Sequence, residues 1–142
     1  MLRIDAPFDE RNTYGWYQDS AYDKLNSDPL NACILWCPLV NTNKSNGTLV
    51  IMPKSHNEKT IFFKVKKTDK FSSKQINIPY KYLKKYKEKS INVKANDSIV
   101  TYSNLFHKSG FNSSKKARFT FIVRFNKILS KDYLSFRRII NN

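Results

Sequence analysis

Two short stretches of the chain carry side chains that could bind a metal ion. Residues 15–22, GWYQDSAY, hold Asp19 as a single carboxylate among aromatic side chains. Much later, residues 106–119, FHKSGFNSSKKARF, hold His107 and Arg118. Imidazole and carboxylate groups are ligands of divalent transition metals. Together the two stretches look like part of a metal site whose first ligand has been replaced.

An arginine-containing strand follows the second stretch. In ARFTFIVRF, residues 117–125, alternate side chains point to opposite faces of a strand. One face carries apolar residues, and the other carries Arg118, Thr120, Ile122 and Arg124. An arginine in the inward register of a buried strand needs an anionic partner. That partner is either a carboxylate of the protein or a bound carboxylate ligand.

The elements that would position these residues are predominantly strands. Short apolar or alternating segments separated by turn signals predict an all-β sandwich or barrel. The one plausible helix is YKYLKKYKEK, residues 80–89, with Tyr80, Leu83 and Tyr86 along one edge. The predicted strands are residues 2–4, 16–22, 32–40, 48–52, 60–65, 90–93, 98–102 and 118–126.

Two turns are marked by residues that tolerate left-handed backbone. Asn46-Gly47, between apolar segments, predicts a hairpin because both residues accept a positive φ. Asn96-Asp97 predicts a second turn with Asn96 in the left-handed region.

Length and composition limit the classes of protein. The 142 residues fit one domain, over residues 1–142, and 14% aromatic content is too high for a disordered chain. The formal charge of +15 favours anionic partners, although a solvated lysine face explains most of it. Nucleic acid is not an expected partner, because no known binding motif accompanies the charge.

Targeting signals are not evident in the sequence. The start, MLRIDAPFDER, has acidic residues where a signal peptide needs an apolar core. No apolar run approaches the roughly 18 residues that span a bilayer. We therefore expect a cytoplasmic protein with no membrane partner.

Three segments, in the order found here, resemble the phytanoyl-CoA dioxygenase family of Fe(II)/2-oxoglutarate-dependent oxygenases. They are RIDAPFDERNTYGWYQDSAY, ILWCPLVNTNKSNGTLVIMPKSH and HKSGFNSSKKARFTFIVRF, and they cover nearly the whole chain. The last motif is the most specific, since five positions agree at fixed spacing: His107, Ser109, Gly110, Asn112 and Arg118. The resemblance implies an all-β double-stranded β-helix, a cupin-like jelly roll, with at most one short helix.

The resemblance also implies roles for individual residues. Asp19 would be the metal carboxylate and His107 the distal histidine ligand of Fe(II). Arg118, helped by Ser109, would pair with the far carboxylate of 2-oxoglutarate, and Trp36 would line the co-substrate pocket. An arginine offers the planar, two-pronged fork that a carboxylate matches.

The sequence departs from the family at the first metal ligand. The family pattern is Trp-His-x-Asp, whereas this chain reads Trp16-Tyr17-Gln18-Asp19. Three interpretations stay open. Tyr17 could bind iron as a phenolate, or Asp19 and His107 could hold Fe(II) with the help of 2-oxoglutarate. In the third, catalysis is lost while the fold is kept.

A second departure concerns length. Family members carry a long N-terminal portion that backs the main sheet, and this chain is expected to lack it. The leading hypothesis is a dioxygenase that hydroxylates a small, anionic molecule while converting 2-oxoglutarate to succinate and CO2. The alternative is a non-catalytic jelly roll that binds a carboxylate or a protein partner, which would cover the exposed sheet.

Overall fold

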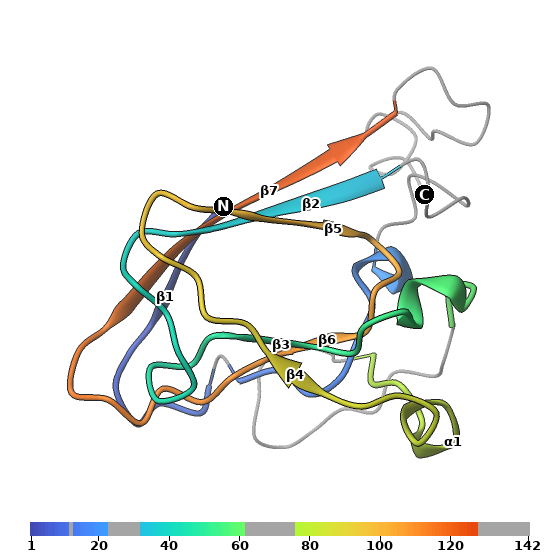
Figure 1. Ribbon diagram of the computed structural model, residues 1–142, viewed down its shortest axis with the longest axis horizontal. Coiled ribbons are helices and arrows are strands. Elements are labelled where there is room, and N and C mark those ends of the chain that lie inside the picture. The colour runs from blue at the N-terminus through green and yellow to red at the C-terminus, as the bar shows by residue number, and fades with distance from the viewer. Residues whose placement is uncertain (12, 23–31, 62–75, 128–142) are drawn as a thin grey trace, which may run out of the picture.

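The computed structural model describes residues 1–11, 13–22, 32–61 and 76–127. Two antiparallel sheets lie one over the other (Figure 1). The larger sheet has the order β1-β7-β2-β5, formed by Leu2–Asp5, Arg118–Asn126, Ala32–Pro38 and Ile99–Tyr102. The smaller sheet has the order β4-β3-β6, formed by Lys89–Ser90, Leu49–Ile51 and His107–Ser109.

Helical structure is confined to single turns in the described residues. Two 3-10 turns, η1 (Asp19–Ala21) and η3 (Ser55–Asn57), accompany one α-helix, α1 (Tyr80–Leu83). The predicted all-β jelly roll with at most one short helix is therefore confirmed. None of these helices is long and apolar enough to cross a membrane.

The apolar core fills the space between the two sheets. Alternation in β2 sends Ile34 and Trp36 inward, and β7 contributes Ile122. Leu49 of β3 and Val93, which follows β4, complete this buried cluster from the opposite side. Burying such side chains contributes about 1.5–3 kcal/mol each, so this cluster is what holds the two sheets together.

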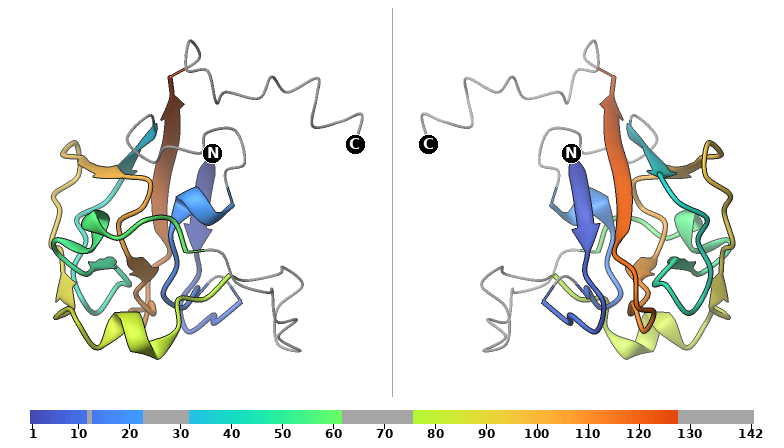
Figure 2. Two further views of the ribbon diagram at one scale, coloured as in Figure 1. Left: turned by 90° about the vertical axis from the view of Figure 1, so that its right-hand side faces the viewer. Right: turned by 90° about the vertical axis from the view of Figure 1, so that its left-hand side faces the viewer.

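The outer face of the larger sheet is also apolar. Figure 2 shows β1 beside β7 at one edge of the molecule, as their pairing requires. Seven large apolar side chains of this sheet are more than a third exposed: Leu2, Ile4, Val100, Tyr102, Phe119, Phe121 and Phe125. Exposed apolar patches of this kind mark surfaces that bind other molecules or aggregate.

The strand predicted over residues 16–22 and the helix predicted over residues 80–89 do not form as expected. Residues 16–22 do not form a strand: Tyr17 makes an isolated bridge to His107, and the chain then turns into η1. The reason is Gln18, whose buried amide binds the backbone of Asn104 and Ile61 and ends the ladder.

The helix stops at Leu83, and Tyr80 is exposed while Tyr82, Leu83 and Tyr86 pack inward.

The turn at Asn46-Gly47 does not close a hairpin. The strands on either side, β2 and β3, belong to different sheets, so the turn carries the chain from one sheet to the other. Gly47 has φ = 80° and Asn96 has φ = 76°, and the predicted left-handed position of Asn96 is therefore confirmed. The predicted strand over residues 60–65 lies mostly outside the described residues, and residues 60 and 61 are not in a strand.

A second buried cluster, around Phe106, indicates which aromatic side chain contributes most to the stability of the fold. Phe106 is 0% exposed and packs with Met52 and Ile78, whereas Phe119 is 38% exposed on the outer face. We expect Phe106→Ala to lower the free energy of unfolding by about 3–5 kcal/mol. Urea denaturation checks this, with Phe119→Ala as the matched control, expected to lose less than about 1 kcal/mol. Equal losses in the two variants would contradict the assigned core.

Candidate metal and carboxylate site

The backbone itself brings the two candidate metal ligands together. Tyr17 and His107 exchange a reciprocal pair of hydrogen bonds: the Tyr17 amide donates to the His107 carbonyl at 3.0 Å, and the His107 amide donates to the Tyr17 carbonyl at 3.1 Å. Asp19 follows two residues later at the start of η1, where it is buried. Segments that are far apart in sequence thus meet at one end of the smaller sheet.

The His107 ring is oriented by its own main chain. Its Nδ1 lies 2.9 Å from the carbonyl oxygen of Leu105, and a carbonyl can only accept, so Nδ1 carries the proton. The other nitrogen, Nε2, faces Oδ2 of Asp19 at 3.5 Å. In a neutral ring, Nε2 would present its lone pair to this anionic oxygen, an arrangement that a shared cation stabilises.

The second oxygen of Asp19 has a different partner. Arg124 donates to Oδ1 from Nη2 at 2.7 Å and from Nε at 3.1 Å. The two oxygens of the Asp19 carboxylate therefore have different partners: Oδ2 faces the His107 imidazole, and Oδ1 accepts from the Arg124 guanidinium. The Arg124 ion pair neutralises the charge of Asp19 inside the protein.

Tyr17 occupies the position next to this pair. Its ring centroid lies 4.2 Å from that of His107. Burial raises the pKa of Tyr17 well above the usual value for a phenol, and the negative charge of Asp19 raises it further. The phenol is consequently protonated at neutral pH, and a protonated phenol is a weak metal ligand.

These observations decide how well the site fits a ferrous ion. His107 Nε2 and Asp19 Oδ2 supply one nitrogen and one oxygen donor of the facial set used by non-haem iron proteins. Tyr17 does not supply the third in its protonated form. Within the described part of the chain, no group of three or more His, Cys, Asp or Glu side chains gathers to hold a metal. The residues thus fit an ion held by two side chains and completed by exogenous ligands.

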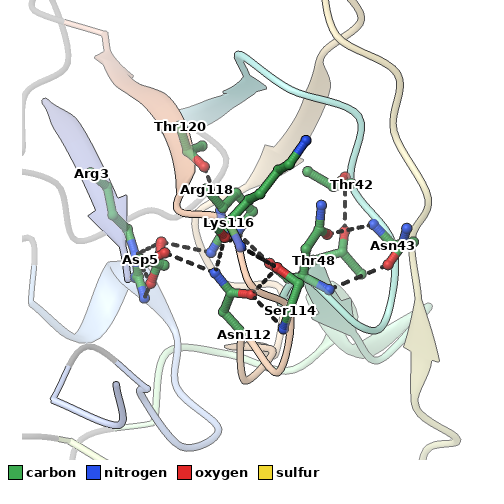
Figure 3. A network of polar contacts seen from close by, with 11 residues as sticks. Arg3, Asp5, Thr42, Asn43, Thr48, Asn112, Ser114, Lys116, Arg118 and Thr120 are labelled. Atoms are coloured by element: carbon green, nitrogen blue, oxygen red, sulfur yellow. Dashed lines mark hydrogen bonds and ion pairs between the residues drawn. The ribbon is translucent and has the colours of Figure 1, made fainter. Parts of the chain in front are cut away.

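Arg118 lies deeper between the sheets. It is 2% exposed, and it sits over the Trp36 ring at 5.5 Å from the centroid. Figure 3 shows its guanidinium in a network that reaches Asp5, whose Oδ2 accepts from Nη2 at 2.7 Å. The Thr120 hydroxyl accepts from Nη1, and the Asn46 carbonyl accepts from Nε at 3.2 Å.

Charge is not balanced around Arg118. Asp5 also pairs with Arg3 at 2.7 Å, so one carboxylate serves two guanidinium groups. Burial lowers the pKa of Arg118, and the nearby carboxylate of Asp5 opposes that effect. The contacts above involve one N–H donor on each of the three guanidinium nitrogens of Arg118. The site has a positive excess suited to an anion.

Two adjoining cavities surround these groups. The inner one, of about 30 Å³, is lined by the predicted residues Asp19, His107, Ser109, Trp36 and Arg118, together with Tyr17. The outer one, of about 550 Å³, is lined by tyrosine rings and by Arg3 and Arg124. Five residues line both cavities and form the boundary between them: Arg3, Tyr17, Asp19, Ile122 and Arg124.

Comparison with known proteins agrees with this geometry. The sequence model of the phytanoyl-CoA dioxygenase (PhyH) family matches residues 6–120 of the chain. The chain belongs to the phytanoyl-CoA dioxygenase family. No curated protein matches the chain significantly in sequence.

Several solved structures share the fold of this chain. EvdMO1 is 25% identical, with a TM-score of 0.63, and covers 88% of this chain and 25% of its own. EctD from S. alaskensis, solved with 2-oxoglutarate and 5-hydroxyectoine, is 18% identical, with a TM-score of 0.67 over 89% of this chain and 42% of its own. The carbocyclase SnoK from nogalamycin biosynthesis is 13% identical, with a TM-score of 0.72. The match covers 99% of this chain and 54% of SnoK. The chain therefore spans between a quarter and about half of these proteins.

Sequence reasoning placed this family's site residues in one region but missed two neighbours. All five predicted residues, with Tyr17, line the inner cavity. Asp5 and Arg124 were not assigned roles. Arg124 could have been found, because it shares the inward face of β7 with Arg118 at an even spacing. Asp5 carried no comparable signal, since its role depends on how β1 pairs with β7.

The raised pKa of Tyr17 predicts an alkaline loss of stability. An unfolded tyrosine ionises near pH 10, whereas Tyr17 in the folded protein resists ionisation. Its contribution is thus complete below about pH 10 and falls as the pH rises further. We expect Tyr17→Phe to lose less unfolding free energy than the native chain between pH 8 and pH 11. Urea denaturation at both pH values measures this, with the exposed Tyr80→Phe as control, and parallel curves for Tyr17→Phe and native protein would refute it.

Proposed function

We propose that this protein is an Fe(II)/2-oxoglutarate-dependent dioxygenase of the phytanoyl-CoA dioxygenase family. It would hydroxylate a small, anionic molecule while 2-oxoglutarate is converted to succinate and CO2. Family membership supports the general class, and the substrate and cytoplasmic location belong to the proposal.

One observation carries the proposal. His107 Nε2 and Asp19 Oδ2 converge to 3.5 Å at the wall of the same cavity that contains Arg118. An imidazole and a carboxylate suit Fe(II), while a guanidinium suits the carboxylate of a co-substrate. These are the two recognition tasks that such an enzyme must combine.

The residues of the chain have separable tasks in this proposal. Asp19 and His107 would hold Fe(II), which when bound couples oxygen activation to the decarboxylation of 2-oxoglutarate. Arg118 would bind the far carboxylate of 2-oxoglutarate, with the Ser109 hydroxyl beside it, in an inner cavity that must widen from about 30 Å³ to admit the co-substrate. The buried Trp36 ring excludes water from the guanidinium and thereby strengthens its attraction for an anion.

The outer cavity would receive the substrate. It is large enough for a small organic molecule, and Tyr14 and Tyr22 give it an apolar wall. Around the two cavities, three guanidinium groups face two carboxylates among the described ion pairs, which favours a substrate with negative charge: Arg3 and Arg118 with Asp5, and Arg124 with Asp19.

A second function is favoured by the state of the first ligand position. Tyr17 is protonated and Asp19 is already paired with Arg124, so the site is stable without iron. In that case the protein would be a non-catalytic jelly roll that binds a carboxylate without converting it. A protein partner on the exposed outer face of the larger sheet stays a prediction under both functions.

An anaerobic titration with Fe(II) and 2-oxoglutarate tests the choice. We expect the native chain to develop the visible charge-transfer band of an iron-bound 2-oxo acid, and Tyr17→His to develop it at lower iron concentration. The added imidazole would supply the third protein donor of the facial set and so tighten metal binding. Succinate formation in air provides the second readout.

The outcomes separate the two functions. A band and succinate in the native chain support the enzyme. A band confined to Tyr17→His identifies the native protein as a binding module with an otherwise complete site. If neither forms the band while both are folded by circular dichroism, the metal assignment is wrong.

Arg118 provides an independent test of the co-substrate pocket. Arg118→Lys keeps the charge beside Asp5 but loses the planar fork. We expect 2-oxoglutarate affinity to fall about ten- to hundredfold, since charge-assisted hydrogen bonds are worth about 1.5–3 kcal/mol. Calorimetric titration measures the affinity, and Lys108→Arg, on the exposed Lys108–Glu88 ion pair, is the control. Unchanged affinity in Arg118→Lys would show that the anion binds elsewhere.

A further inference from the structure

Arg124 stands where the metal site meets the outer cavity. Its side chain is 40% exposed, whereas its partner Asp19 is 7% exposed. It lines both cavities and donates twice to one oxygen of Asp19. A cation on the protein therefore already occupies the carboxylate that the proposed iron site uses.

Two cations on one carboxylate weaken each other. A divalent ion at Asp19 Oδ2 would lie close to the Arg124 guanidinium on Oδ1, and like charges at this separation repel strongly in a partly buried site. The ion pair also withdraws electron density from the carboxylate. Both effects lower the affinity of Asp19 for metal without changing the fold.

We propose that Arg124 is an internal cation that competes with the divalent metal for Asp19, and that an anionic molecule in the outer cavity relieves this competition by drawing Arg124 away. This inference rests on the metal site of the proposed function and adds a regulation to it. Metal and anionic substrate then bind cooperatively, and the coupling is reciprocal because both act through one guanidinium.

The outer cavity has the chemistry for such an anion. The rings of Tyr14, Tyr17 and Tyr22 form a continuous cluster, with centroid separations of 5.8 and 5.9 Å. Arg3 lies over the Tyr14 ring at 5.6 Å. A molecule that combines an apolar ring with a negative charge would place the ring on the tyrosines and the charge toward Arg3 and Arg124.

The first experiment measures metal affinity without co-substrate or oxygen. Co(II) is added to native protein and to Arg124→Gln, and its visible absorption gives the dissociation constant. We expect Arg124→Gln to bind Co(II) about tenfold more tightly, because a repelling charge is removed. Arg124→Lys, which keeps the charge but loses the double contact, should fall between the two.

A matched control separates competition from general charge effects. Lys108→Gln removes one positive charge from the residue after His107, yet its Nζ faces Glu88 and the Trp16 ring. Its Co(II) affinity should stay within about twofold of native, since exposed charges are screened. The same series in the Tyr17→His background keeps the comparison measurable when native binding is weak.

The second experiment tests the coupling to an anion. Benzenesulfonate carries a ring and a permanent charge but is a poor metal ligand, and methyl phenyl sulfone is its neutral counterpart. We expect benzenesulfonate, and not the sulfone, to tighten Co(II) binding by native protein several-fold, with no effect on Arg124→Gln.

Each outcome has a definite meaning. Weaker or equal Co(II) binding by Arg124→Gln would overturn the competition, as would the lack of Co(II) binding by every variant. The lack of a benzenesulfonate effect on native protein would overturn the coupling. Tighter binding by Arg124→Gln without any 2-oxoglutarate band would leave this inference standing while the proposed function fails.

Discussion

A buried guanidinium is the constraint on which the arrangement of this protein depends. Arg118 is enclosed between the sheets, and an unpaired charge there would cost several kcal/mol. Asp5 supplies the countercharge from the edge strand β1, while Asn112 donates to the Asp5 carbonyl and ties the loop after β6 to the same point. The edge strand is thus held in register partly by electrostatics.

The site contains two buried carboxylates, Asp5 and Asp19, and each lies between two basic side chains. Arg118 and Arg3 share Asp5, while Arg124 and His107 face the two oxygens of Asp19. Each carboxylate has two cationic or potentially cationic neighbours. Anions are therefore attracted to both ends of the cavity, whereas a metal ion must compete for its ligand.

Strand alternation, a local property, predicted the all-β fold. The family resemblance of the motifs indicated five of the side chains that line the inner cavity: Asp19, Trp36, His107, Ser109 and Arg118. The sequence did not predict the turn of the chain at Gln18, since two distant backbone partners of that amide end the ladder. The roles of Asp5 and Arg124 were not predicted for the same reason. Their roles arise from pairings across β1, β7 and η1, which no local pattern encodes.

The reciprocal hydrogen bonds between Tyr17 and His107 involve only main-chain atoms. The spacing of the ligand positions is therefore independent of which side chain stands at residue 17. Tyrosine and histidine codons differ by a single base transition, and the half-buried Tyr17 ring lies beside His107 in a space large enough for the smaller imidazole ring. An imidazole at residue 17 is thus one mutation away, and the main-chain contacts with His107 would place it beside that residue without a change of fold.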